Sequence, residues 1–521
     1  MDFAHPSRRR FLKAGLATAI GAAAGPIVSS TGWAEASPQS TSQSARIKID
    51  FDRQLGRIDR NIYGNFTEHL GRCVYGGIYD EGSPLSDKDG FRKDVLEAAR
   101  GIHIPLLRWP GGNFSSGYSW KDGVGPKDAR PRKWDTAWQE EESNRFGTDE
   151  FIAYCRKLGA EPYICVNLGT GTIQEAADWV EYCNGKMNTE WANLRRKNGH
   201  AEPYGVKYWG LGNEMYGPWQ AGRKTAKEYA ELALETAKMM RWVDPDIKLI
   251  ACGGNYPDWD REVLQQVVDI VDYISLHRYG GSNDIAREMD VATQLERQIH
   301  VLDSVITEVM ARTRRKDRIK IAVDEWNIWF RTTDTGDQPK KLEEIYDLQD
   351  ALWVASALNV FHRQCRTVTL ANMAQLVNVI APIMTSPTGL VLQTTYYPLK
   401  LYTEHAGDIA LDALVRSDSF PEFPDTPYLD VSVTTDEDKR KLSIAIVNRH
   451  STSDIPVEIL VEGFTMPARA DLFVVNGPKL DATNTFASPN NVGIEHRQIS
   501  GLGPKFSQTC SAHSVTMIAI G

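Results

Sequence analysis

The chain has 521 residues, of which 42% are hydrophobic and 24% are charged, so it can bury a large core in two to four domains. This composition is that of a soluble globular protein. The formal net charge is −9, with acidic and basic residues mixed along the chain, and the absence of a basic stripe argues against a nucleic-acid partner.

The first 36 residues are predicted to be an export signal. Three arginines (8–10) precede a small-residue, mildly apolar run (14–28), and Ala34-Glu35-Ala36 offers a cleavage site. This order is typical of a twin-arginine signal, which implies a periplasmic or extracellular protein without a membrane segment in its mature form. A basic disordered tail does not explain the order, and an uncleaved anchor needs a longer, more apolar run.

A Ser-rich linker (37–45) is predicted next, followed by an N-terminal strand (46–56) with strictly alternating apolar residues at its start. From 57 to 402, short apolar runs alternate with helical segments, which predicts strands buried on both faces of a parallel sheet. The eight expected strands are 61–66, 104–109, 161–168, 206–211, 247–252, 271–276, 319–323 and 369–373.

Helical segments fill the gaps between these strands. Thr148 is a candidate N-cap for a helix that Gly159 ends, and longer segments cover 225–243 and 343–362. Eight strands alternating with helices predict a (β/α)8 barrel as the catalytic domain, 57–402. A doubly wound open sheet is the alternative, but no Gly-rich phosphate loop follows the first strand.

The last segment, 403–521, is predicted to be an antiparallel β-sandwich. Alternating runs separated by turn-rich segments occupy 429–433, 441–447, 455–461, 469–475 and 514–520. Because the isolated strand at 46–56 needs a sheet, we expect it to join this domain.

The cysteine pattern does not predict a disulfide framework or a metal centre. Seven scattered cysteines, without a CxxC pair or an HExxH motif, are expected to be buried free thiols. We therefore expect no metal and no cofactor.

Two carboxylates, Glu214 and Glu325, follow the ends of two predicted barrel strands. Structural ion pairs would explain each of them alone. The chemistry of barrel enzymes lies at the carboxyl ends of the strands, however, and other polar and aromatic side chains gather at the same ends. These are Glu68, Arg108, Asn113, Asn213, His277, Tyr279, Trp329 and Gln375. Hydroxyl-binding groups, stacking surfaces and two carboxyl groups are what a sugar site needs.

These residues also carry a family resemblance. The motifs are IYGNFTEHLGR (62–72), VYGGIYD (74–80), LLRWPGGNFSSGYSWKDGVGP (106–126), LGNEMYGPWQ (211–220), DYISLHRY (272–279), VDEWNIW (323–329) and AQLVNVIAPIM (374–384). They cover the whole predicted barrel, and the chain resembles the α-L-arabinofuranosidases of glycoside hydrolase family 51. The resemblance implies an exo-acting enzyme that releases arabinose from arabinan- or arabinoxylan-derived saccharides. It also implies a homo-oligomer, a hexamer in many members.

By this resemblance, Glu214 is the general acid/base and Glu325 the nucleophile of a retaining double displacement. The expected sugar ligands are Glu68, Asn113, Asn213, Tyr279 and Gln375, with Trp138 and Trp329 as walls. His277 is expected to orient the acid/base, and Arg108, also a predicted substrate-binding residue, is expected with Tyr279 or His277 to favour ionised Glu325. Trp138 as a loop core residue and His277 as a structural histidine are the alternatives.

The chain departs from the family pattern at Tyr216, where an acidic residue is common, and at Gly280, where a polar-aromatic run is shortened. Both departures put leaving-group preference in doubt. A related barrel glycosidase (an endoglucanase, β-xylosidase or galactofuranosidase) is the first alternative function. A catalytically inactive carbohydrate-binding protein is the second.

Overall fold

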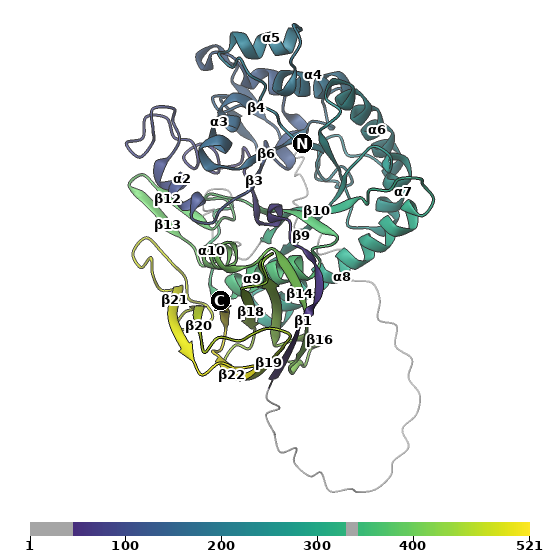
Figure 1. Cartoon of the computed structure of the whole chain (residues 1–521). Coiled ribbons are helices and arrows are strands. Elements are labelled where there is room, and N and C mark those ends of the chain that lie inside the picture. Colours follow the sequence, from purple (N-terminus) through teal and green to yellow (C-terminus); the bar gives the residue numbers. More distant parts are fainter. Residues whose placement is uncertain (1–44, 330–341) are drawn as a thin grey trace, which may run out of the picture.

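The structure is a computed structural model that describes residues 45–329 and 342–521. The predicted export signal (1–36) and all but the last residue of the predicted linker (37–45) lie outside the described residues. A barrel with its helices lies above a sheet-rich C-terminal domain in Figure 1, and the described chain begins in that lower domain. None of the helices in these two ranges is long and apolar enough to cross a membrane.

Eight parallel strands close into a barrel in the order β10-β11-β2-β3-β6-β7-β8-β9. Their bounds are β2 Gly64–Phe66, β3 Leu106–Trp109, β6 Glu161–Val166, β7 Tyr208–Leu211, β8 Lys248–Ala251, β9 Tyr273–Gly280, β10 Lys320–Ile328 and β11 Val368–Ala374. Each predicted strand has its counterpart, and the closure excludes the open sheet. The barrel interior is packed with Leu106, Tyr163, Tyr208, Ile250, Ala322 and Leu370. The predicted (β/α)8 fold is confirmed.

Helices cover the outside of the barrel (Figure 1). They are α2 Lys93–Arg100, α3 Thr148–Leu158, α4 Ile173–Asn184, α5 Glu190–Lys197, α6 Ala226–Val243, α7 Pro257–Val267, α8 Ile285–Met310, α9 Leu348–Arg363 and α10 Tyr396–His405. Thr225 caps α6 by accepting from the Glu228 amide.

The predicted N-termini of two helices were wrong. Gly147, not Thr148, is the N-cap of α3, and α9 begins after 343 because Asp347 caps it.

The C-terminal domain is a nine-stranded sheet in the order β21-β20-β23-β18-β17-β14-β1-β19-β22. Its strands are β1 Ala45–Arg57, β14 Ile409–Arg416, β17 Leu429–Thr435, β18 Leu442–Asn448, β19 Ile455–Glu462, β20 Arg469–Asn476, β21 Gly493–Ser500, β22 Lys505–Cys510 and β23 Ser514–Ile520. β1 joins it, as predicted, but pairs antiparallel with β14 and parallel with β19. One apolar core holds residues from both halves of the sheet, so the sheet folds over itself.

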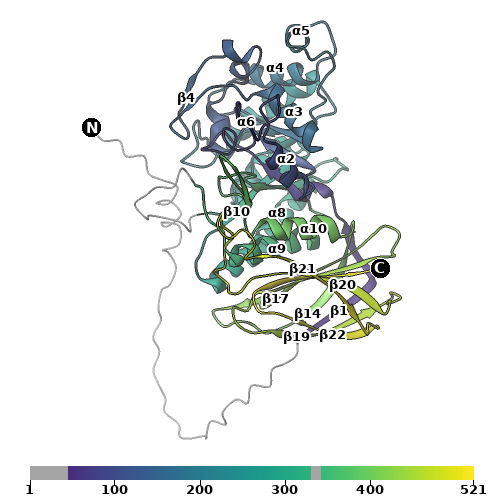
Figure 2. The same ribbon diagram turned by 90° about the vertical axis from the view of Figure 1, so that its left-hand side faces the viewer.

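Helices α8, α9 and α10 lie between the barrel and the sheet (Figure 2). A buried charge cluster joins the two domains here, because Arg363 of α9 and Arg449 both bind the carboxylate of Asp430. His362 bonds Tyr63 of the barrel side and Ser432 of the sheet. Burial lowers the pKa of His362 to about 3, so it is neutral in this interface. The contact therefore fixes the barrel on the sheet.

All seven cysteines are buried free thiols, as expected from their scattered positions.

Candidate active site

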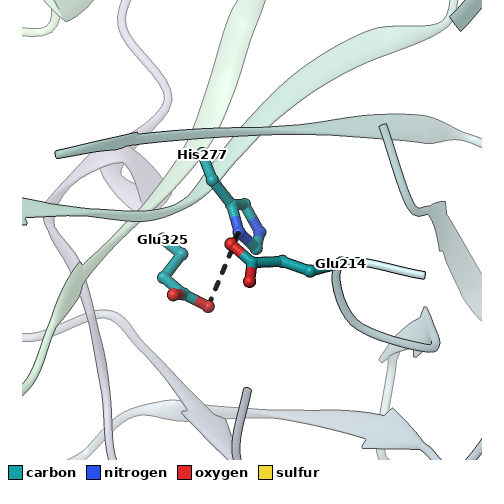
Figure 3. A group of neighbouring side chains, drawn as sticks. All are labelled: Glu214, His277 and Glu325. Atoms are coloured by element: carbon teal, nitrogen blue, oxygen red, sulfur yellow. Dashed lines mark hydrogen bonds and ion pairs between the residues drawn. The ribbon is translucent and has the colours of Figure 1, made fainter. Parts of the chain in front are cut away.

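The two predicted carboxylates meet at the carboxyl end of the barrel. Glu214 follows β7 after Gly212, and Glu325 lies on β10. One oxygen from each carboxylate and one nitrogen of His277 lie within 4.8 Å of one another, and all three side chains are buried (Figure 3). Glu214 has a φ of +41°, in the left-handed region that side chains avoid. Such strain, of order 1–3 kcal/mol, is typical of functional positions.

His277 bridges the two carboxylates from β9. Its Nδ1 lies 3.0 Å from Glu214 Oε1 and 3.6 Å from Glu325 Oε2, while its Nε2 lies 3.2 Å from Asp324 Oδ1. Burial opposes the charge, but Glu325, Asp324 and Glu214 together raise the pKa of His277 to about 10. His277 is therefore a cation at neutral pH, and it holds both carboxylates in place.

This charge also bears on whether the cluster could hold a metal. Glu214, His277 and Glu325 have the spacing of a cation site. A histidine must be neutral to bind a metal, so a metal would have to compete with the proton that the raised pKa of His277 favours. The three groups therefore suit an acid–base pair bridged by an imidazolium.

Strand β10 carries an irregularity beside the site. Ala322 pairs with Ser275 and Glu325 pairs with His277, so β10 advances three residues where β9 advances two. Adjacent strand residues normally point to opposite faces, but the extra residue lets both Asp324 and Glu325 reach His277. Asp324 therefore does not point to the opposite face, as the residue next to Glu325 would on a regular strand. Its carboxylate is a buried partner of His277.

Two donors hold Glu325. Arg108 of β3 donates from Nη1 to Glu325 Oε2 at 3.0 Å, and Tyr279 donates its hydroxyl to Oε1 at 2.7 Å. Tyr279 follows His277 by two residues on β9, so both face the same side. Arg108 also donates to Asn213 Oδ1 at 2.6 Å. These contacts fix the Glu325 oxygens and stabilise negative charge on them.

Glu68 is the centre of a second group of predicted residues. Its carboxylate accepts from Trp138 Nε1 at 3.0 Å and from Gln375 Nε2 at 3.1 Å, and the Phe114 amide donates to it as well. Burial and the charge of Glu325 nevertheless raise the pKa of Glu68 to about 8. A carboxyl that can hold or release a proton near neutral pH suits a partner for sugar hydroxyls.

Gly112 brings the two groups together. A Cβ built on it would lie 3.3 Å from Glu325 Oε2, 3.4 Å from Asn213 Nδ2 and 3.5 Å from Glu68 Oε2. Asn113 follows it directly, at the start of a 3-10 turn (Asn113–Gly117), and is partly buried. The loop after β3 therefore runs along the floor of the site.

Trp329 completes the set of predicted residues. It is buried and meets the Tyr279 ring edge-on, with centroids 5.3 Å apart. All of the predicted residues thus lie at one end of the barrel. Seven of them are in contact around Glu325, three more around Glu68, and Asn113 is placed by its neighbour Gly112.

The sequence is similar to α-L-arabinofuranosidases over both domains. The family model of the α-L-arabinofuranosidase 1 domain matches residues 98–297, and that of the α-L-arabinofuranosidase C-terminal domain matches 324–514. A probable α-L-arabinofuranosidase C of Aspergillus clavatus is 42% identical over 504 residues, covering 92% of this chain and 98% of that protein. The chain belongs to the α-L-arabinofuranosidases of glycoside hydrolase family 51.

Further similar proteins are also α-L-arabinofuranosidases. The intracellular exo-α-(1→5)-L-arabinofuranosidase 1 of Bacillus subtilis is 41% identical, covering 86% of this chain and 93% of that protein. The arabinose complex of the Thermotoga maritima α-L-arabinofuranosidase has 46% identity and a TM-score of 0.86, covering 91% and 99% of the two chains. The family 51 enzyme of Thermotoga petrophila has 47% identity and a TM-score of 0.87, covering 92% and 100%.

Sequence reasoning missed three contacts in this family 51 site. Trp219 donates its indole N–H to Glu214 Oε2 at 2.5 Å. Tyr163 donates to Asp324 Oδ2 at 2.6 Å, beneath the site. Asn255 holds the His277 backbone, accepting from its amide and donating to its carbonyl. The tryptophan in the GPW turn was the only visible signal, because the other two contacts depend on how strands pack side by side.

Gly112→Ala is expected to lower kcat/KM by up to about 10²-fold, because the added methyl lies closer than usual to Glu325 Oε2 and must displace that oxygen, while it also fills space beside Asn213 and Glu68. The melting temperature should stay close to that of the wild type. Gly389→Ala is the matched control, since a Cβ there meets nothing within 4 Å. Equal activity in both variants would contradict the placement of Gly112 at the site floor.

His277 is expected to make stability fall at alkaline pH. Its pKa is about 10 in the folded protein against an ordinary value of 6.5, so its stabilisation is complete below pH 6.5 and disappears as pH rises towards 10. The slope of one proton is about 1.4 kcal/mol per pH unit. Urea unfolding at pH 6.5, 8 and 9.5 should show a steeper loss in the wild type than in His277→Gln. The control is His496→Gln, which changes an exposed histidine. Identical slopes in wild type and His277→Gln would refute the charge assignment.

Proposed function

We propose that the protein is an exo-acting, retaining α-L-arabinofuranosidase with Glu214 as acid/base and Glu325 as nucleophile. The observation that carries the mechanism is the spacing of the two carboxylates, whose nearest oxygens lie within 4.8 Å. Retaining glycosidases hold these groups about 5–5.5 Å apart, whereas inverting enzymes need about 6.5–9.5 Å for a water molecule. The short spacing of the two carboxylates supports the retaining mechanism.

In the first step, Glu325 attacks the anomeric carbon while Glu214 donates its proton to the leaving oxygen. The glycosidic bond breaks, and the sugar is held as an ester of Glu325. In the second step, Glu214 removes a proton from water, whose oxygen attacks the same carbon and releases Glu325. Arg108 and Tyr279 stabilise the Glu325 carboxylate before attack and after release.

His277 helps Glu214 to act first as a general acid and then as a general base. Its cation stabilises Glu214 as a carboxylate once the proton has left, and it stabilises Glu325 while that group is ionised, before attack and after release. Trp219 donates to the other oxygen of Glu214, which fixes the direction in which that carboxyl points. The acid/base is therefore held from two sides.

We propose that the glycone is an arabinofuranosyl unit bound by Glu68, Asn113, Asn213, Tyr279 and Gln375, with Trp138 and Trp329 as walls. Two hydrogen bonds hold Glu68 and Gln375 side by side, which suits neighbouring hydroxyls of one sugar ring. Glu68, Asn213, Trp329 and Gln375 are buried and the other three residues are partly buried, and a recessed site of this kind favours a chain end over an internal unit. The natural substrates proposed are arabinan- and arabinoxylan-derived saccharides, acted on at terminal non-reducing units.

The proposal extends to export and assembly. The predicted twin-arginine signal supports a periplasmic or extracellular enzyme, whereas the Bacillus subtilis relative is named as intracellular. Secretion is tested by following the full-length chain and its Arg8→Lys/Arg9→Lys variant in cell fractions. The homo-oligomer, a hexamer by family resemblance, is tested by light scattering of the purified chain.

A panel of chromogenic glycosides tests the activity. The 4-nitrophenyl α-L-arabinofuranoside should be hydrolysed faster than the β-D-xylopyranoside, β-D-galactofuranoside and β-D-glucopyranoside. Faster release from any of the other three would favour a related barrel glycosidase. Binding of arabino-oligosaccharides without turnover of any substrate would favour an inactive carbohydrate-binding protein.

A further inference from the structure

Four aromatic side chains lie together on the Glu214 side of the site. The Tyr216 ring meets Trp219, Tyr256 and Trp259 edge-on, with centroids 6.0, 6.0 and 5.8 Å apart. Trp259 is buried and supports the group from beneath, whereas Tyr256 is 61% exposed. A tyrosine ring exposed to this degree, resting on another aromatic ring, offers a surface to a ligand.

The cluster is tied to the catalytic groups at two points. Trp219 donates to Glu214 Oε2. Asn255, the residue before Tyr256, accepts from the His277 amide at 3.2 Å and donates to the His277 carbonyl at 2.8 Å. Asn255 has a φ of +56°, which asparagine tolerates better than most residues. The loop that carries Tyr256 is thus held against the strand that carries His277.

The proposed role of Glu214 indicates which part of the substrate lies on this side of the site. A general acid must reach the oxygen of the leaving group, so the leaving group lies beside Glu214. The proposed glycone ligands Glu68 and Gln375 lie beyond Gly112, on the side of Glu325. Tyr216 and Tyr256 are therefore placed where the leaving group passes out of the site.

We propose that Tyr216 and Tyr256 form a binding site for the saccharide leaving group, with its sugar ring stacked on their aromatic faces. This inference rests on the proposed function. Sugar rings have one face of C–H groups, which packs on aromatic rings while the hydroxyls remain in water. Because Trp219 contacts both Tyr216 and Glu214, a sugar bound here lies next to the side chain that aligns the acid/base.

The test compares two substrates that share the glycone and differ in the leaving group: α-1,5-L-arabinobiose and methyl α-L-arabinofuranoside. Tyr216→Ala and Tyr256→Ala should each lower kcat/KM for the disaccharide by about twofold to tenfold, the range expected for an aromatic contact. They should lower kcat/KM for the methyl glycoside much less, so that the ratio of the two values falls. Tyr216→Phe, which keeps the ring, should behave as the wild type with both substrates.

Trp242→Ala is the control, since Trp242 is 73% exposed on the last turn of α6. Parallel losses with both substrates, or an unchanged ratio in both Ala variants, would overturn the proposal. A loss confined to 4-nitrophenyl α-L-arabinofuranoside would also overturn it, in favour of an aryl leaving group. If the wild type hydrolyses neither arabinofuranoside, it is the proposed function that fails.

Discussion

Replacing Glu325 with Ala is expected to lower kcat by about 10⁴- to 10⁶-fold, the scale seen when a nucleophile is removed. The attacking oxygen is lost, and Arg108 and Tyr279 lose the carboxylate to which they donate. Folding should persist, because Arg108 keeps its hydrogen bonds to the Asp324 carbonyl and to Asn213. Turnover of 4-nitrophenyl α-L-arabinofuranoside, with unfolding temperature as the folding check, measures both effects.

Added azide provides a second test of Glu325 as the nucleophile. In Glu325→Ala, azide can enter the space left by the side chain and attack the anomeric carbon, giving a glycosyl azide of inverted configuration. The control Glu462→Ala, on the C-terminal sheet, should keep full activity without azide. Undiminished turnover in Glu325→Ala would remove the nucleophile assignment.

The Glu214→Ala variant should lose activity according to the leaving group. General acid catalysis contributes about 10²- to 10⁴-fold, so a sugar leaving group, which must be protonated, should suffer a loss of this size. A 2,4-dinitrophenyl leaving group departs without a proton, and its release should be almost unaffected. Deglycosylation then becomes slow, so a burst of dinitrophenol should precede the steady state. Azide should restore turnover here with retained configuration.

Equal losses for both leaving groups in Glu214→Ala would contradict the acid/base role. Trp219→Phe provides the comparison, because it removes the N–H that fixes Glu214 while keeping an aromatic ring. We expect it to show the same leaving-group dependence with a smaller amplitude.

The barrel was predictable from the sequence because its strands are short apolar runs that helices separate. The C-terminal sheet domain was less predictable from the sequence. Strand β21 (Gly493–Ser500) is mostly exposed and polar, and it pairs only at the sheet edge, so its sequence lacks an apolar alternation. The parallel pairing of β1 with β19 was also hidden, because it joins segments about 400 positions apart in the printed sequence.

Some features of the candidate site could likewise be predicted from the sequence, and others could not. Residues at strand ends, such as Glu214, Glu325 and His277, could be named from position and family resemblance. The irregularity in β10 that turns Asp324 towards His277 could not, since it depends on register against a neighbouring strand. The Asn255 contact with the His277 backbone was hidden for the same reason. Local sequence thus predicts which side chains reach the site, while strand pairing decides what each contacts.

The stereochemistry of the first product tests the central proposal most directly. Proton NMR of the arabinose released from 4-nitrophenyl α-L-arabinofuranoside, recorded before mutarotation, shows which anomer forms first. Two displacements at one carbon, by Glu325 and then by water, should give the α-anomer. Initial formation of the β-anomer would mean a single displacement, and it would contradict the roles assigned to Glu214 and Glu325.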